Sequence, residues 1–111
     1  MTNNKIKLLI TGSTGRLGRV VVEYLKTKED IELFTPSHQE MDIRFPDKIE
    51  AYLLKTFPDI ILHLAAIAKV DYCENNKRAA YDVNVLGTKD LLKIFRELKP
   101  TGYFILMSTP C

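Results

Sequence analysis

The 111-residue sequence has no tryptophan, only two cysteines and no long run of apolar residues. Its apolar stretches fall short of the ~20 residues that a membrane-spanning helix needs, and residues 1–5 lead into a strand pattern instead of a signal-peptide core. Cys73 and Cys111 show neither the spacing of metal ligands nor a disulfide framework. We therefore expect a cytoplasmic protein with reduced cysteines, without membrane contact and without a bound metal.

An excess of charge of one sign is also missing, since 16 basic residues are interspersed with 14 acidic residues to give a net charge of +2. No basic block is available to follow a phosphate backbone, which argues against nucleic acid as a partner. A hydrophobic fraction of 46% and a charged fraction of 27% are typical of a globular protein. The length fits one domain covering residues 1–111.

Apolar periodicity along the chain alternates between the pattern of strands and the pattern of helices. Short aliphatic runs predict strands, and stripes at i, i+3, i+4 and i+7 predict amphipathic helices. Pro46 stands at a favourable first helical position, and Pro58 ends that helix. The predicted strands cover residues 6–10, 31–34, 60–66 and 103–107, and the predicted helices cover residues 16–26, 46–57 and 76–98.

Strands that alternate with helices at this spacing form right-handed βαβ units. We therefore expect an α/β, three-layer Rossmann-type fold with a doubly wound parallel sheet, truncated to about four strands in the spatial order 3-2-1-4. The last strand would lie at a sheet edge. Because an open edge is a template for pairing, we expect a homo-oligomer that forms through that strand.

Glycines at every third position connect the first predicted strand to the first helix. Gly12 allows a sharp turn, Gly15 lets a pyrophosphate approach the backbone, and Gly18 lets the helix pack close to the sheet. The helix N-terminus adds unpaired N–H groups and a positive dipole. A purely structural tight turn is the alternative. We expect this loop to bind a dinucleotide through Gly12, Ser13, Thr14, Gly15, Arg16, Leu17 and Gly18.

The Thr-Gly-x-x-Gly-x-x-Gly form of this loop resembles the fingerprint of the extended short-chain dehydrogenase/reductase family. Within that family the likeness is greatest to the dTDP-4-dehydrorhamnose reductases, on Met41-Asp42-Ile43, on Val70-Asp71 with Glu74, and on the Ser-Thr end of the fourth strand. Epimerases, dehydratases and fucose-synthesis reductases share most of these residues. Further matching stretches are residues 58–66, 81–88 and 106–109.

This resemblance implies an NAD(P)-dependent oxidoreductase that passes hydride to a 4-keto nucleotide sugar. It implies that Asp42 contacts the adenine, that Asn84 supports the active-site geometry, and that Ser108 and Thr109 are catalytic candidates, with Thr109 bonded to the substrate carbonyl. Considered without the family, Asp42 is a loop acid that caps a turn and Asn84 a solvated polar position. The cofactor-binding positions that the resemblance adds are Asp42, Ile43, Ala65, Ala66 and Asn84.

The family's catalytic Tyr-x-x-x-Lys pair, which lies beyond the fourth strand, does not follow Ser108 and Thr109 in this sequence. Neither Tyr72 nor Tyr81 has a lysine four residues later. Because that tyrosine donates a proton to the substrate, we expect the chain alone to be inactive as a reductase. The alternatives are a non-catalytic cofactor-binding or regulatory module and a fragment of an NAD-dependent epimerase or dehydratase.

The sequence leaves NAD and NADP as nearly equal candidates for the cofactor. The acid that selects NAD at the end of the second strand is missing, which weakens the argument for NAD. Ser37, His38 and Arg16 or Arg19 are candidates to face a 2′-phosphate. His63 lies in the most apolar strand, so we expect a hydrogen-bonded core histidine rather than a catalytic base.

Overall fold

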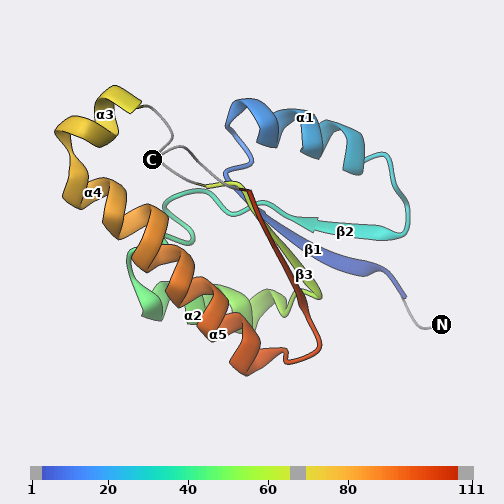
Figure 1. The fold of residues 1–111 in the computed structure, drawn as a ribbon. Coiled ribbons are helices and arrows are strands. Elements are labelled where there is room, and N and C mark those ends of the chain that lie inside the picture. Colours follow the sequence, from blue (N-terminus) through green and yellow to red (C-terminus); the bar gives the residue numbers. More distant parts are fainter. Residues whose placement is uncertain (1–3, 66–69, 108–111) are drawn as a thin grey trace.

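The computed structural model describes residues 4–65 and 70–107. Within these residues, four parallel strands form one sheet with helices on both faces (Figure 1). This confirms the predicted α/β class. The strands are β1 (Ile6–Thr11), β2 (Ile31–Phe34), β3 (Ile60–His63) and β4 (Tyr103–Leu106). The helices are α1 (Arg16–Leu25), α2 (Pro46–Thr56), α3 (Val70–Asn75), α4 (Lys77–Tyr81), the π-helix η1 (Asp82–Gly87) and α5 (Thr88–Leu98).

Local sequence signals explain where α2 begins and ends. Pro46 is its first residue, where a missing N–H costs nothing. Phe57 ends the helix in the left-handed region, with φ of 46°, and its N–H donates to the Leu53 carbonyl at 2.7 Å. Pro58 follows and cannot continue the helix. The sequence therefore predicted this helix to within a residue of its observed end.

The predicted strand order 3-2-1-4 is wrong, because the strands lie in the order β2-β1-β3-β4. α1 and α2 lie on opposite faces of the sheet (Figure 1). Since βαβ crossovers are right-handed, a connection over one face moves the chain one way along the sheet, and a connection over the other face moves it back. β3 therefore pairs with β1, with Leu8 opposite Ile60. This order places a topological switch point between β1 and β3.

The hydrophobic core lies between the sheet and the layer formed by α2 and α5. The face that carries α1 is thinly covered, because α1 buries only Gly18 and leaves Val20 and Tyr24 largely exposed. Packing therefore fixes α2 and α5 much more firmly than α1. The core residues are Leu9, Met41, Ile43, Ile49, Leu53, Ile61, Leu91 and Phe95.

The long helix predicted over residues 76–98 is divided into α4, η1 and α5. The π-helix η1 inserts wider turns in its middle. At its end, a Cβ atom on Gly87 would lie 2.9 Å from the Ile43 side chain, so a larger residue there would require that side chain to shift. The contact between the helix and residue 43 is a tertiary feature that helical periodicity does not reveal.

β4 is the last strand of the sheet and pairs with β3 only, as far as the described residues go. Tyr103, Ile105 and Leu106 keep 71%, 52% and 57% of their surfaces exposed. The predicted self-association through this strand stays a prediction, which the exposed apolar side chains support.

Further expectations concerned the cysteines, contact with a membrane and the binding of a metal. Cys73 is disulfide-bonded, so the expectation of reduced cysteines is wrong at this residue. Cys111 lies outside the described residues. Within residues 4–65 and 70–107, no helix has the length and apolar character needed to cross a membrane, and no group of side chains in the same ranges has the composition of a metal site.

Candidate functional site

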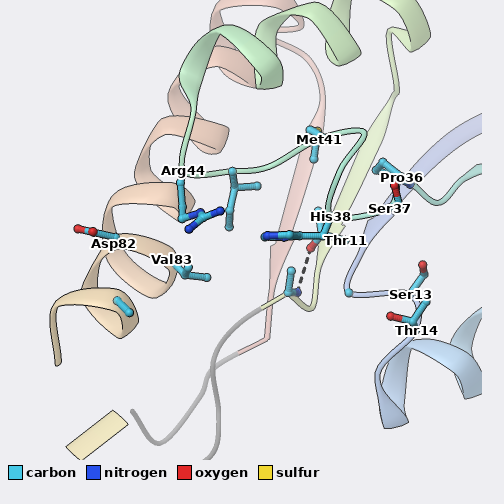
Figure 2. A pocket seen from close by; sticks show the side chains of 14 residues that line it. Thr11, Ser13, Thr14, Pro36, Ser37, His38, Met41, Arg44, Asp82 and Val83 are labelled. Atoms are coloured by element: carbon cyan, nitrogen blue, oxygen red, sulfur yellow. Dashed lines mark hydrogen bonds between the residues drawn. The ribbon is translucent and has the colours of Figure 1, made fainter. Parts of the chain in front are cut away.

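A cavity of about 590 Å³ opens at the switch point, beyond the carboxyl ends of β1, β2 and β3 (Figure 2). The glycine-containing loop after β1 forms one wall through residues 11–14. The segment after β2 forms a second wall through residues 36–38, 41, 43 and 44, and residues 79, 82 and 83 of the α4–η1 helix form a third. Open α/β sheets bind their ligands at this position. The cavity is therefore our candidate cofactor site.

Two glycines of the loop are required by the fold itself. Gly12 has a φ of +70°, and a Cβ atom there would lie 2.7 Å from the backbone nitrogen of Ala65. A Cβ atom on Gly18 would overlap the Gly12 carbonyl oxygen. Any side chain at either position therefore forces the backbone to move.

Gly15 differs, because a Cβ atom there would meet only the Gly12 carbonyl oxygen, at 3.4 Å. Its backbone angles, φ of −72° and ψ of 176°, suit any residue. Gly15 is the N-cap of α1 and supplies no side chain to the first N–H groups of that helix. Nothing in the described fold requires glycine at this position, and the open space can admit an anion to the helix N-terminus.

Only part of the predicted glycine loop lines the cavity. Gly12, Ser13 and Thr14 do so, together with the buried Thr11, whereas residues 15–18 do not. Of the other predicted cofactor positions, Ile43 and Ala65 also line it. Ala66, Ser108 and Thr109 lie outside the described residues.

Thr11 joins the ends of β1 and β3 at the cavity floor. Its side-chain oxygen accepts hydrogen bonds from the N–H groups of Leu64 and Ala65, both at 3.0 Å. The same oxygen lies 2.7 Å from Nδ1 of His63. Because both acceptor positions of the hydroxyl are used, the Thr11 O–H must donate to His63 Nδ1. The turn that follows β3 is thereby fixed against β1.

His63 is a buried histidine with a partner on each ring nitrogen. Since Nδ1 accepts from Thr11, the ring proton is on Nε2, which donates to the Thr88 hydroxyl at 2.8 Å. Burial lowers the pKa of His63 from 6.5 to about 4, so the ring is neutral near pH 7. The structure confirms the expectation of a hydrogen-bonded core histidine. His63 positions Thr11 and does not line the cavity.

Asp42 and Arg44 form a fork beside the cavity. The Asp42 carboxylate accepts hydrogen bonds from the Arg44 backbone N–H at 3.1 Å, from Nε at 3.0 Å and from a terminal guanidinium nitrogen at 2.6 Å. His38 Nε2 lies 3.4 Å from the same carboxylate. The Arg44 hydrogen bonds lower the pKa of Asp42 to about 2. Arg44 and His38 line the cavity, whereas Asp42 does not.

Arg44 was missed from the sequence, although the Asp-x-Arg spacing is a local signal for this fork. Asn84, by contrast, was predicted to belong to the site. It lines a smaller hollow of about 210 Å³ with Cys73 and Tyr81, outside the main cavity. Asp82 and Val83, its neighbours on η1, face the main cavity instead.

A Tyr-x-x-x-Lys spacing does occur in the chain, at Tyr24 and Lys28. The Lys28 ammonium lies 4.6 Å from the centroid of the Tyr24 ring. Tyr24 is at the end of α1 remote from the glycine loop and is exposed, and neither residue lines the cavity. This pair therefore cannot serve a ligand bound there.

Comparison with known proteins finds that this chain is similar in sequence and in structure to enzymes named for nucleotide sugars. The chain is 37% identical over 94 residues to GDP-6-deoxy-D-talose 4-dehydrogenase from Aggregatibacter actinomycetemcomitans, covering 84% of this chain and 31% of the relative. It is 34% identical over 85 residues to dTDP-4-dehydrorhamnose reductase from the same organism, covering 77% and 29%. A crystal structure of dTDP-4-dehydrorhamnose reductase from Bacillus anthracis in complex with NADP superposes with a TM-score of 0.79 at 28% identity, covering 85% and 33%.

The chain thus spans about a third of the length of these relatives. A family model described as the RmlD substrate binding domain matches residues 6–109. The match includes the glycine loop, the Asp42 segment and all four strands. This chain belongs to the RmlD substrate binding domain family.

Proposed function

We propose that this chain binds NAD(P) in the cavity at the switch point and forms the cofactor-binding part of a nucleotide-sugar reductase. The observation that carries the proposal is the open approach at Gly15, where the described fold does not itself require glycine. The related Bacillus anthracis reductase, which holds NADP, supports it. Such a reductase would transfer hydride to a 4-keto nucleotide sugar. The relative named dTDP-4-dehydrorhamnose reductase is an example of an enzyme of this kind.

The residues of the cavity fit a dinucleotide. The N-terminus of α1 offers N–H groups and a positive dipole to the diphosphate, close to Ser13 and Thr14. The turn fixed by Thr11 brings Ala65 to the cavity floor, where a small side chain leaves room for the cofactor. We propose that the wider set of contacts includes Gly12, Ser13, Thr14, Gly15, Ile43 and Ala65.

When bound, the nicotinamide ring supplies hydride for the reduction of a carbonyl group. The residues described here act by binding and orienting: the glycine loop holds the phosphates, and the Thr11–His63 hydrogen bond fixes the turn against which the cofactor lies. A neutral His63 keeps this arrangement at physiological pH. We propose Ser108 and Thr109 as catalytic residues, with Thr109 bonded to the substrate carbonyl.

The cofactor proposal is tested by calorimetric titration of the chain with NADPH and with NADH. Gly15→Arg places a bulky side chain at the open approach and should abolish binding. Val20→Arg is the matched control, because it adds the same side chain to an exposed position of α1 and should bind like the wild type. Equal binding by both variants, or no binding by the folded wild-type chain, would refute the proposed site.

The two titrations also decide between the cofactors. The segment after β2 contributes Ser37 and His38 to the lining of the cavity and contributes no acidic residue to it. We therefore propose a preference for NADPH, since an acid at this place is what favours the 2′-hydroxyl of NADH. Tighter binding of NADH would contradict this preference while leaving dinucleotide binding itself intact.

A further inference from the structure

Cys73 belongs to a disulfide bond that has no part in the proposed function. The residue lies in α3, and it is disulfide-bonded. The only other cysteine in the sequence is Cys111, which comes shortly after Leu106 at the end of β4. β3 and β4 are paired, with His63 opposite Leu106. Both cysteines therefore follow the carboxyl ends of neighbouring strands, at the edge of the sheet where the cavity opens.

The helices next to Cys73 are held to the fold by little packing. α3 contacts α4 more than any other element. Of the α4 residues only Ala80 is buried, and the core between the sheet and the α2–α5 layer contains no residue of α3 or α4. Figure 1 shows α3 at the far end of the helical segment that runs back from α5 through α4, away from α2. Such a segment can open locally while the core stays folded, so a covalent bond at Cys73 adds a restraint that packing does not supply.

The segment that α3 leads into also forms a wall of the cavity. Ala79, Asp82 and Val83 line the main cavity, whereas Cys73 and Tyr81 line the smaller hollow. One helical segment thus separates the two spaces. A displacement of α3 and α4 would move this wall and change the shape of the main cavity.

The surroundings of Cys73 give small thiols access to it. The residue is half-buried and lines the hollow of about 210 Å³. Lys77 lines the same hollow, and the described residues around it include no acidic side chain. The positive charge attracts an anionic thiol such as glutathione. Accessible disulfides are the ones that exchange readily with thiols and serve regulation.

We propose that Cys73 and Cys111 form a redox switch that controls the order of α3 and α4 and, through them, the wall of the cavity. In the oxidised chain the bond holds both helices in place. In the reduced chain they open, and the cavity loses the wall that includes Ala79 and Asp82. The consequence for dinucleotide binding rests on the proposed function, whereas the control of the two helices does not.

The switch operates by thiol–disulfide exchange. A glutathione thiolate attacks one sulfur of the bond and forms a mixed disulfide, and the other cysteine leaves as a thiolate that takes up a proton. A second glutathione then displaces the first cysteine. Two glutathione molecules become one molecule of glutathione disulfide, and the chain gains two thiols. Glutathione disulfide reverses both steps.

The test compares the chain after equilibration with reduced glutathione and with glutathione disulfide. Thiol titration should find no free thiol in the oxidised chain and two in the reduced chain. Without nucleotide, reduction should speed amide hydrogen exchange in residues 70–81 about tenfold and leave exchange in α2 unchanged. Calorimetry should show about tenfold weaker NADPH binding after reduction, the loss expected if the wall is in place in about a tenth of the molecules.

Variants separate the bond from other effects of the buffers. Cys73→Ser and Cys111→Ser each remove the bond, so both should match the reduced wild type in either buffer. Thr101→Ser is the matched control, because it introduces the same side chain at an exposed position and should keep the redox response of the wild type.

Several results would overturn the inference. These are two free thiols in both buffers, equal exchange of residues 70–81 in the two forms, and a disulfide-linked dimer on non-reducing electrophoresis. Loss of exchange protection in α2 on reduction would also do so, because the bond would then support the whole fold. Failure of the proposed function looks different: neither form would bind NADPH, while the exchange difference in residues 70–81 would remain.

Discussion

The buried His63 makes the stability of the chain depend on pH in a defined window. The pKa of this ring is about 4 in the folded chain because burial disfavours its charged form, against 6.5 when exposed. Between these values the unfolded state binds more protons than the folded state, so lowering the pH favours unfolding. The His63 contribution to the free energy of unfolding is therefore full above pH 6.5 and lost progressively as the pH falls toward 4.

The size of the effect follows from linkage. Each unit of pKa difference is worth about 1.4 kcal/mol, so the complete loss is about 3 kcal/mol, with about 2 kcal/mol of it between pH 7.5 and pH 5. Asp42 acts in a separate window, because Arg44 holds its pKa at about 2 and its contribution is lost only below its ordinary value of 3.8. The interval from pH 7.5 to pH 5 therefore isolates His63 from Asp42.

Urea unfolding followed by circular dichroism at several pH values measures this dependence. His63→Gln removes the titrating ring and keeps groups able to bond Thr11 and Thr88, so the variant should be less stable at pH 7.5 but nearly insensitive to pH down to 5. His38→Gln is the matched control: His38 is an exposed histidine, and the variant should keep the wild-type pH dependence. Equal pH slopes for His63→Gln and the wild type would refute the assigned origin of the effect.

Further predictions concern the loop, the sheet and its edge. Gly18→Ala should destabilise the chain by about 1–3 kcal/mol, because the new methyl group overlaps the Gly12 carbonyl oxygen. Gly15→Ala should change the stability by less than about 1 kcal/mol, and the urea midpoints of the two variants measure this difference. Asp59→Ala should cost about 1–2 kcal/mol in the same assay, because the carboxylate accepts a backbone N–H from β1. Ile105→Lys should reduce any concentration-dependent self-association measured by sedimentation, because it charges the exposed β4 edge, and unchanged association would place the interface elsewhere.

Local signals in the sequence predicted most of the elements. The aliphatic run before the glycine loop became β1, Pro46 begins α2, and the residues 31–34 predicted as a strand are those of β2. These features depend on neighbours a few residues apart, which periodicity and turn residues report. The strand order was not accessible in this way, because the face of the sheet that α2 covers depends on packing with α5, which is distant in the sequence.

In the candidate site, too, features set by neighbouring residues were predicted from the sequence, and features set by tertiary packing were not. The glycines at positions 12, 15 and 18 predicted the ligand-binding loop, but their spacing alone did not reveal that only Gly15 is free of a packing requirement. The bond between Thr11 and His63 joins residues 52 apart, and no local pattern predicts it. Arg44 was not predicted as a site residue, because its place in the site depends on a cavity whose opposite wall is formed by η1, which is distant in the sequence.

The thin cover on the α1 face has a consequence for hydrogen exchange. With only Gly18 buried, α1 has little apolar packing to resist local opening, so its amide protons should exchange with solvent faster than those of α2 and α5. The same helix carries the N-terminus to which we assign the phosphates. A bound dinucleotide would then act as the missing packing layer and slow exchange along α1, by an amount set by ligand concentration relative to its dissociation constant.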